Sequence, residues 1–210
     1  MPLKQLLAES PKMRWLVEHL HRLKRVSKPE RGEKVIIFCE FRDLQVLLQR
    51  VIRECLGLDV SVVNGDTSAS LEVDNSRQKL IDRFQRVPGF NAIVLSPLAV
   101  GFGVNIQAAN HVVHFTRTWN PAKEDQATDR AYRIGQERDV TVYYPSVVGQ
   151  GFDSFDTVLH KLLNWKRGLA EDMLNAVGGA FMVSALAFGL AMFCTLGTSN
   201  FSSTGRRLSV

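Results

Sequence analysis

Lys34-Val-Ile-Ile-Phe-Cys39 is a short, continuous apolar run that follows the polar connector Ser27-Lys-Pro-Glu-Arg-Gly-Glu33. Such a run is typical of a strand buried on both faces in a parallel sheet. Four more strands are expected, at residues 59–63, 91–95, 111–115 and 140–144. The run therefore predicts the first strand of a parallel sheet.

Helices are expected between these strands, because apolar residues recur there at helical spacing. Ser10-Pro11 predicts an N-cap followed by proline at the first helical position, with a helix that continues to about Val26. The other helices are expected at residues 43–58, 71–86, 121–133 and 155–174. Strands that alternate with helices predict a doubly wound α/β fold with ligands at the carboxyl ends of the strands.

The composition bounds the class of protein. The 210 residues are 45% hydrophobic and 22% charged, which suits one globular domain with a substantial core. A formal charge of +5 is consistent with a phosphate-bearing partner. The three cysteines form no CxxC pair, and residues 1–26 resemble no signal peptide. This pattern argues against a disulfide scaffold or zinc site and favours a reducing, intracellular setting.

The carboxyl-terminal tail has a different character. Residues 173–205 include no charged side chain, residues 180–196 are almost wholly apolar, and Arg206-Arg207 follows them. The tail is open to three interpretations: a short membrane span with an interfacial anchor, a buried terminal helix, or a segment foreign to the rest of the gene product. It does not decide the function.

The helix expected after Asn120-Pro121 carries unusual polar residues. Gln126, Arg130 and Arg133 are spaced i, i+4 and i+7, which would place them on one helical face. Two converging guanidiniums suit the charge that spreads over a phosphoryl group during its transfer. The alternative is a solvated basic face. The continuation Ile134-Gly-Gln136 favours the phosphate ligand, because it stops the helix close to Arg133.

A second candidate site follows the strand at residues 91–95. Gly101 and Gly103 lie two residues apart beyond the strand end, where glycine permits close approach of the backbone to a phosphate or another chain. A tight turn is the alternative for such a pair. The glycine pair lies at the carboxyl end of a strand, about twenty residues before the arginine helix, and this position favours a ligand-binding loop over a tight turn.

Together these motifs resemble the second, C-terminal RecA-like lobe of the Swi/Snf-type helicase-like ATPases of superfamily two. The resemblance runs from about Ser10 to Tyr144, in the family's order and spacing. Six stretches carry it: Val35-Ile-Ile-Phe-Cys-Glu-Phe41, Asn64-Gly-Asp-Thr-Ser68, Arg77-x-x-x-Ile81-x-x-Phe84, Ala99-Val-Gly-Phe-Gly-Val-Asn-Ile106, Trp119-Asn-Pro121 and Gln126-x-x-x-Arg130-x-x-Arg133-Ile-Gly-Gln136. DEAD-box RNA helicases tend to have a third arginine at the position of Gln136.

The chain departs from the family pattern at two places. Val100 replaces the first glycine of the usual Ala-Gly-Gly run, and His114-Phe-Thr-Arg-Thr118 lacks a common aspartate and an extra aromatic residue. The sequence also contains no Gly-x-x-x-x-Gly-Lys-Ser/Thr loop and no Asp-Glu pair at a strand end. In the family those groups belong to the first lobe, so this chain alone is expected not to hydrolyse ATP.

The resemblance implies a fold and a domain organisation. We expect a three-layer RecA-like α/β domain with a mainly parallel sheet, flanked by N-terminal and C-terminal helices. The expected segments are an N-terminal helix and connector (1–33), the lobe (34–150), an amphipathic helix (151–176) and the apolar tail (177–210). In the family, a helix at the third position often braces across the first lobe. A plain amphipathic helix on its own domain is the alternative.

The resemblance also assigns roles at the ATP site. ATP, with Mg²⁺, binds between two lobes in this family, and the second lobe's arginines reach the γ-phosphate. Arg130 and Arg133 would be these arginine fingers, and Gln126 would link the nucleotide state to the grip on nucleic acid. The loop between the two ligands would contain Gly101, Gly103 and Asn105.

Nucleic-acid contacts would fall at strand ends on the same face, where hydroxyls and cations hold phosphate without reading sequence. The candidates are Phe41, Arg42, Thr67, Ser96 and Trp119. Two alternatives remain open: Trp119 as a core aromatic, and Thr67 with Ser68 as caps of the helix expected near Leu71.

The implied function is the C-terminal lobe of a DNA-dependent ATPase that translocates on double-stranded DNA. It would need a first lobe in cis or in trans, inside the cell, in the cytoplasm, nucleoid or nucleus. The alternative is a non-catalytic module that binds nucleic acid or a partner, with a membrane tether at the tail. Gln126, Arg130 and Arg133 favour the ATPase half, since a binding module needs no γ-phosphate sensor.

Overall fold

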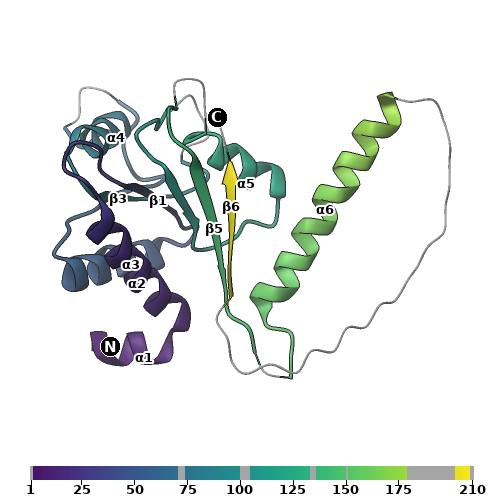
Figure 1. The fold of residues 1–210 in the computed structure, drawn as a ribbon, viewed down its shortest axis with the longest axis horizontal. Helices are drawn as coiled ribbons and strands as arrows, with labels where there is room; N and C mark the ends of the chain where they lie inside the picture. The colour runs from purple at the N-terminus through teal and green to yellow at the C-terminus, as the bar shows by residue number, and fades with distance from the viewer. Residues whose placement is uncertain are drawn as a thin grey trace.

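A computed structural model describes residues 2–70, 74–99, 105–132, 136–149, 151–178 and 202–208. Its centre is one sheet with the strand order β2-β3-β1-β4-β5-β6 (Figure 1). The strands are β1 (Lys34–Phe38), β2 (Ser61–Val63), β3 (Asn91–Leu95), β4 (His111–His114), β5 (Val140–Ser146) and β6 (Ser202–Leu208). β1 to β5 pair in parallel, and β6 pairs with β5 in antiparallel fashion.

Helices cover both faces of this sheet, because the side chains of the central strands are apolar on both sides. Every residue of β1 and β3 is buried. Val35 and Ile37 face the core that contains α1 (Leu3–Glu9), α2 (Pro11–Val26) and α3 (Arg42–Leu56). Ile36 and Phe38 face the opposite core, which contains α4 (Arg77–Arg86) and α5 (Pro121–Thr128). The predicted three-layer α/β fold with a mainly parallel sheet is confirmed.

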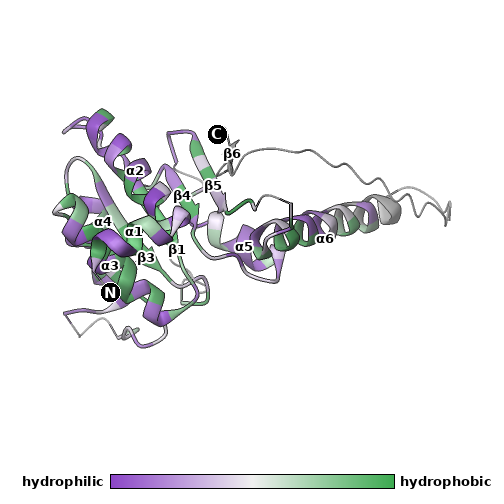
Figure 2. Ribbon diagram, turned by 90° about the horizontal axis from the view of Figure 1, so that it is seen from below, coloured by the Kyte–Doolittle hydropathy of each residue, from purple (hydrophilic) through white to green (hydrophobic). Residues whose placement is uncertain are grey.

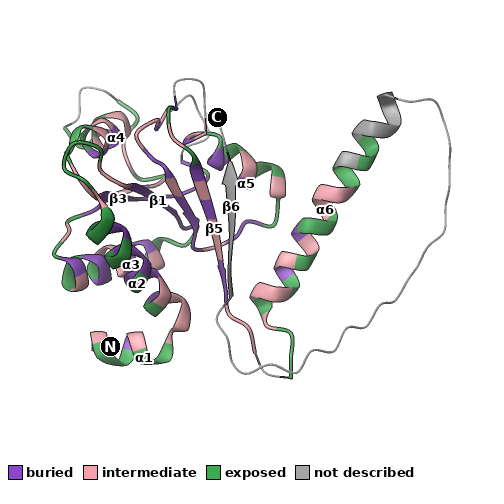
Figure 3. Cartoon of the chain, viewed as in Figure 1, coloured by how far each residue is buried: buried purple, intermediate pink, exposed green. Residues whose placement is uncertain are grey.

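The start of α2 follows the predicted capping pattern. The Ser10 hydroxyl accepts a hydrogen bond from the Met13 amide at 3.3 Å, and Pro11 occupies the first helical position. The helix then buries one apolar face against the sheet, as the colouring by exposure shows (Figure 3). The buried apolar residues of this face are Met13, Leu16, Val17, Leu20 and Leu23.

Two predicted helices differ from the structure at one end. The helix predicted at 43–58 ends at Leu56, because Gly57 adopts a left-handed backbone with φ of 62°. The helix predicted at 71–86 begins only at Arg77. Ser76 before it is extended, and the Arg77 amide donates to the Ser68 carbonyl at 2.8 Å. Residues 71–73 lie outside the described part of the chain.

The helix predicted at 121–133 is also shorter than expected, because α5 ends at Thr128. The chain continues in tighter turns, in which the Arg130 amide donates to the Ala127 carbonyl at 3.2 Å. The Arg130 carbonyl accepts from the Ile106 amide at 2.9 Å. The predicted C-terminal bound of this helix is therefore wrong, and Arg130 lies beyond the helix that carries Gln126.

The C-terminal helix α6 (Phe155–Gly178) extends away from the body of the molecule (Figures 1 and 2). Its first half contacts the sheet layer beside α5, and its last turns project from it. Of the described side chains in α6, Leu159 and Leu163 are the buried apolar ones. Apolar burial on α6 is therefore confined to two turns.

Only part of the apolar tail is described. Residues 202–208 form β6, which the sequence did not predict and which places Arg206 opposite Val142 in the pairing with β5. The apolar run at 180–196, and with it the membrane interpretation, lies outside the described residues. Within the described residues, no helix combines the length and the apolar character required to cross a membrane.

Candidate functional site

The carboxyl ends of β1, β2, β3 and β4 meet at one edge of the sheet, because these strands are parallel neighbours. Phe41 and Arg42 follow β1 at this edge, and both side chains are exposed. Arg42 Nη2 lies 2.9 Å from Asp66 Oδ1 in the loop after β2. Both charged groups of this pair are open to water, so the guanidinium can exchange its partner at little cost.

Thr67 follows β2 and holds its own loop. Its hydroxyl accepts from the Asn64 amide at 3.1 Å, and its amide donates to the Asn64 carbonyl at 3.2 Å. Ser68 contributes only its backbone carbonyl to the start of α4, and its hydroxyl accepts from the Ser70 amide. Side-chain capping of α4 by Thr67 or Ser68 is therefore wrong.

Ser96 and Trp119 differ in accessibility. Ser96 follows β3 but is buried, and its amide donates to the Val63 carbonyl at 2.8 Å. Trp119 is 57% exposed, and its ring meets the edge of Phe155 with centroids 5.8 Å apart. The interpretation of Trp119 as a core aromatic is wrong. An exposed indole at a strand end is free to contact a ligand.

Two side chains without a predicted role fix these loops. Arg77 Nη1 donates to the Ala99 carbonyl at 2.9 Å and Nη2 to the Thr67 carbonyl at 3.2 Å, which joins the loops after β3 and β2. Gln45 is buried, donates to the Cys39 carbonyl at 2.7 Å and accepts from Asn64 at 3.0 Å. Arg77 belongs to one of the six stretches that carry the family resemblance, so the sequence pointed to it. Gln45 is an isolated glutamine on a predicted helix, and no sequence pattern marks it as functional.

The structure brings the predicted finger segment to the glycine-containing loop. The Ile106 amide donates to the Arg130 carbonyl at 2.9 Å, so Arg130 adjoins the described end of that loop. Arg130 is half-buried, and Gln126 is exposed on α5. Asn105 is half-buried, and its carbonyl accepts from Gln85 at 3.4 Å. The other predicted members of this site, Arg133, Gly101 and Gly103, lie outside the described residues.

Gln136 anchors the chain after the finger segment. Its buried amide donates to the carbonyls of Gln107, Ala109 and Ala131 at 2.9, 2.8 and 3.1 Å. Its side-chain oxygen accepts from the Arg138 amide at 3.1 Å. A longer guanidinium would not fit this closed set of carbonyls and one amide. Gln136 thus fixes the return of the chain toward β5.

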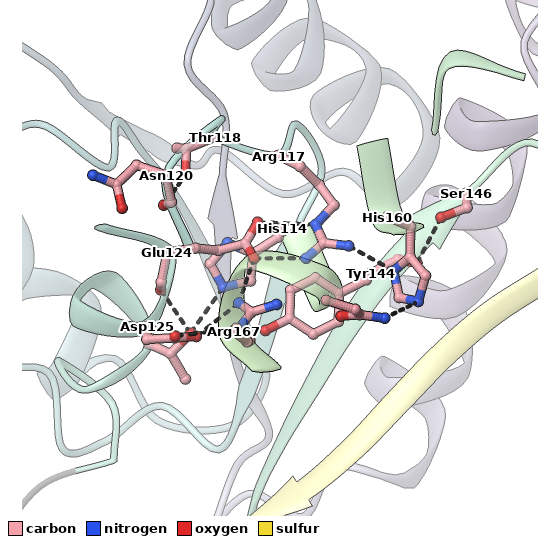
Figure 4. Close-up of polar contacts among 12 residues, drawn as sticks. His114, Arg117, Thr118, Asn120, Glu124, Asp125, Tyr144, Ser146, His160 and Arg167 are labelled. Atoms are coloured by element: carbon pink, nitrogen blue, oxygen red, sulfur yellow. Dashed lines mark hydrogen bonds and ion pairs between the residues drawn. The ribbon is translucent and has the colours of Figure 1, made fainter. Parts of the chain in front are cut away.

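A cluster of buried charges lies beside α5 (Figure 4). Glu124 is 0% exposed, and its two oxygens accept from Arg117 Nε and Nη2 at 2.9 and 2.7 Å. Arg167 of α6 donates to the same carboxylate at 2.8 Å and to Asp125 at 2.8 and 3.3 Å. Arg117 also donates to His160 Nδ1 at 2.7 Å. Sequence reasoning missed this cluster.

The protonation states in the cluster follow from burial and pairing. Burial opposes charge on Glu124, but hydrogen bonds from Arg117 and the nearby cations bring its pKa below the ordinary value. Burial lowers the pKa of His114 to about 4, and that of His160 is lowered by burial and by the two arginines. Both imidazoles are therefore neutral near pH 7, and Glu124 is ionised.

His114, the last residue of β4, is fully buried next to this cluster. Its Nε2 lies 2.9 Å from the Thr128 hydroxyl, and its ring stacks on Tyr144 with centroids 5.1 Å apart. The Thr128 hydroxyl donates to the Glu124 carbonyl, so it accepts from His114 Nε2. The Arg117 guanidinium lies over the Tyr144 ring, with its central carbon 4.3 Å from the ring centroid. The end of α5 is thus held from β4 and β5.

The fold and the site define a class: a parallel α/β lobe with polar loops at the carboxyl ends of its strands, and with a glutamine and an arginine on α5 and in the turn after it. The model of the helicase conserved C-terminal domain matches residues 11–135. The chain therefore belongs to the helicase C-terminal family, and it is the C-terminal lobe of a Swi/Snf-type helicase.

Individual relatives agree with this assignment. Zorya protein ZorD of Escherichia coli O139:H28 (strain E24377A / ETEC) is 57% identical over 167 residues, which is 80% of this chain and 15% of ZorD. A Sulfolobus solfataricus SWI2/SNF2 ATPase core in complex with dsDNA is 34% identical with a TM-score of 0.59, over 81% of this chain and 32% of that one. The C-terminal part of the Fun30 ATPase domain is 29% identical with a TM-score of 0.61, over 75% and 46%. The chain thus spans a small part of ZorD.

Proposed function

We propose that this chain supplies the arginine fingers and part of the DNA grip of an ATP-driven translocase on double-stranded DNA. The observation that carries the proposal is the hydrogen bond from the Ile106 amide to the Arg130 carbonyl, since it joins the segment of the proposed finger to the described end of the glycine-containing loop. An arginine beside this loop can donate two hydrogen bonds to a phosphoryl group. Such a finger contributes about a thousandfold or more to phosphoryl transfer.

The described residues fit the phosphate half of the nucleotide site. Gln126 on α5 offers an amide, and Arg130 in the turn after α5 offers a guanidinium. Within the described residues, no group of three His, Cys, Asp or Glu side chains is arranged to hold a metal. Mg²⁺ and its carboxylate ligands would therefore come with the first lobe, and bound Mg²⁺ would neutralise phosphate charge there.

The DNA grip would use the exposed strand-end residues. Arg42 can exchange Asp66 for a DNA phosphate, while Phe41 and Trp119 offer exposed rings beside it. The Thr67 hydroxyl is half-buried and Ser96 is buried, so these two would contribute through the shape of their loops. The dsDNA in the Sulfolobus solfataricus SWI2/SNF2 complex supports a duplex partner. A duplex partner supports a location inside the cell, in the cytoplasm, nucleoid or nucleus, which belongs to this proposal.

Mixing the full chain with a purified first lobe of a Swi2/Snf2 ATPase tests the proposal. We expect DNA-stimulated ATP hydrolysis from the mixture and from neither part alone. Arg130→Ala and Arg133→Ala should each lower the stimulated rate by about a thousandfold. Arg50→Ala, an exposed charge on α3 paired with Glu54, is the matched control and should retain the rate.

DNA binding gives the second arm of this test. Arg42→Ala should weaken binding of duplexes of different sequence equally, because phosphate contacts carry no sequence information. Intact DNA binding with no ATPase activity in the mixture would instead support a non-catalytic binding module. Loss of neither activity in the arginine variants would refute the finger assignment.

A further inference from the structure

The contact between α6 and α5 consists largely of charged groups that converge on one carboxylate. Glu124 lies between the guanidiniums of Arg117 and Arg167, at 2.7 and 2.8 Å from its Oε2 atom (Figure 4). Arg117 comes from the segment that precedes α5. Arg167 belongs to α6 and is 43 residues away from Glu124 in sequence. The cluster is therefore a tertiary contact between two helices.

Charge balance separates the roles of the two arginines. Arg117 is 3% exposed in its side chain and makes a two-point contact with Glu124, which satisfies the buried carboxylate by itself. Arg167 is 19% exposed and is balanced by Asp125, whose side chain is about half exposed. Removal of Arg167 would thus leave no buried charge unpaired. Its two-carboxylate contact is not needed to neutralise the core.

The position of Arg167 does have a consequence for α5. Its guanidinium spans Glu124 and Asp125, consecutive residues of the helix, and its neighbour Lys166 donates to the Trp119 carbonyl at 3.0 Å. α6 thus contacts α5 on its second turn and the chain just before its N-cap, Asn120. These contacts oppose both sliding and rotation of α5.

α5 needs such external support. The helix has eight residues, far fewer than an isolated helix requires in water, and its buried side chains are Glu124, Ala127 and Thr128. Gln126 directly follows Asp125, and Arg130 begins the turn beyond the helix end. Any displacement of α5 relative to the sheet therefore displaces both residues.

We propose that Arg167 is a positioning residue, which fixes α5 so that the finger segment meets its phosphate in the correct geometry. This inference rests on the proposed function of Arg130. It makes the docking of α6 a determinant of ATPase rate, although α6 contributes no group to the reacting atoms. A misplacement of about 1 Å at a reacting centre can cost about a hundredfold in rate.

The test compares Arg167→Gln with Lys161→Gln in the full chain mixed with the first lobe. Both variants remove one positive charge from α6, but Lys161 pairs with Asp153 in solvent and does not touch α5. We expect Arg167→Gln to lower kcat by about tenfold or more while KM for ATP changes by less than about twofold, since positioning acts in the transition state. Arg167→Lys should recover part of kcat, and Lys161→Gln should match the unaltered chain.

Amide hydrogen exchange of the full chain alone gives a readout that needs no first lobe. Exchange in residues 121–132 should quicken in Arg167→Gln and stay unchanged in Lys161→Gln, with the sheet protected in both. Unchanged exchange in Arg167→Gln, or faster exchange with an unchanged kcat, would overturn the positioning role. Arg130→Ala, assayed in parallel, separates the two proposals, because full activity in that variant refutes the fingers and leaves the exchange result interpretable.

Discussion

Helices α2 and α6 attach to the body of the molecule in opposite ways. α2 buries five apolar side chains in the core shared with β1 and β3. Among the described side chains, α6 buries the apolar residues Leu159 and Leu163 (Figure 3), and it makes several ion pairs and hydrogen bonds to the rest of the chain, among them those of Asp156, His160 and Arg167. Burial of apolar surface attaches α2, whereas directed polar contacts make up a larger share of the attachment of α6.

This difference indicates which helix can change position. Apolar burial stabilises by roughly 25 cal/mol per Å² whatever the exact orientation, and salt does not screen it. Partly exposed ion pairs contribute about 1 kcal/mol or less each and weaken as salt rises. We therefore expect α6 to detach from the body of the molecule more readily than α2.

The largest effect is expected where the charged contact reaches the core. Glu124→Gln leaves the buried guanidinium of Arg117 without its counter-charge, whereas Arg167 keeps Asp125. The free energy of unfolding should fall by about 3–5 kcal/mol, as for other broken buried pairs. Denaturant titration of the full chain measures it, and Glu18→Gln on the exposed face of α2 is the control. A loss below about 1 kcal/mol would mean that the cluster is hydrated.

Apolar attachment of α2 should be almost as costly to damage. Leu20 is fully buried between α2 and the sheet, so Leu20→Ala should lower the free energy of unfolding by about 2–5 kcal/mol, through lost burial and the cavity left behind. Trp165→Ala on α6, where the side chain is 61% exposed, should change it by less than about 0.5 kcal/mol. Equal losses in the two variants would contradict the contrast between the helices.

Acid should loosen α2 through His19. This imidazole stacks on Trp15 and meets Tyr143 edge-on. Burial, followed by Arg22 and His111 as neighbours, lowers its pKa to about 3 from 6.5. The unfolded chain therefore takes up the proton first, so stability is full above pH 6.5 and falls as the pH drops toward 3. We expect a loss of about 2 kcal/mol, below the limit set by the full shift. His19→Asn should flatten this pH profile; an unchanged profile would exclude His19 as its cause.

The smallest effect is expected where the two helices meet directly. Lys12 of α2 lies 2.9 Å from Asp156 of α6, and both side chains are mostly shielded from water. A double-mutant cycle with Lys12→Gln and Asp156→Asn should give a coupling of about 1 kcal/mol that shrinks as salt is added. A coupling of zero at low salt would show that this pair of α2 and α6 does not stabilise the fold.

Local sequence patterns were sufficient for most of the fold. The bounds of β3 were predicted correctly, because the short apolar run at residues 92–95, between Gly89 and Pro97, has few other structures available. The capped start of α2 was also predicted, since Ser10-Pro11 is a local signal. Errors fell at element ends, as at α5, which ends at Thr128 and continues in turns instead of reaching residue 133.

The candidate site was only partly accessible to the same reasoning. Motifs pointed to Arg130, Gln126 and the strand-end loops, because strand ends of a parallel sheet converge whatever the side chains do. The pairing of Glu124 with Arg167 could not be predicted, since it joins residues 43 apart whose spacing follows no local period. Whether Trp119 lies in the core or at the surface was equally a matter of tertiary packing.

Association of the two lobes around a transition-state mimic tests the central claim most directly. ADP with aluminium fluoride mimics the phosphoryl group in transfer, and a finger from this chain should bind it across the lobe interface. We predict that the mimic tightens binding of the full chain to the first lobe by tenfold or more. Arg130→Ala should remove that gain and leave binding without nucleotide unchanged. Equal tightening in Arg130→Ala and the unaltered chain would contradict the proposed role of this lobe.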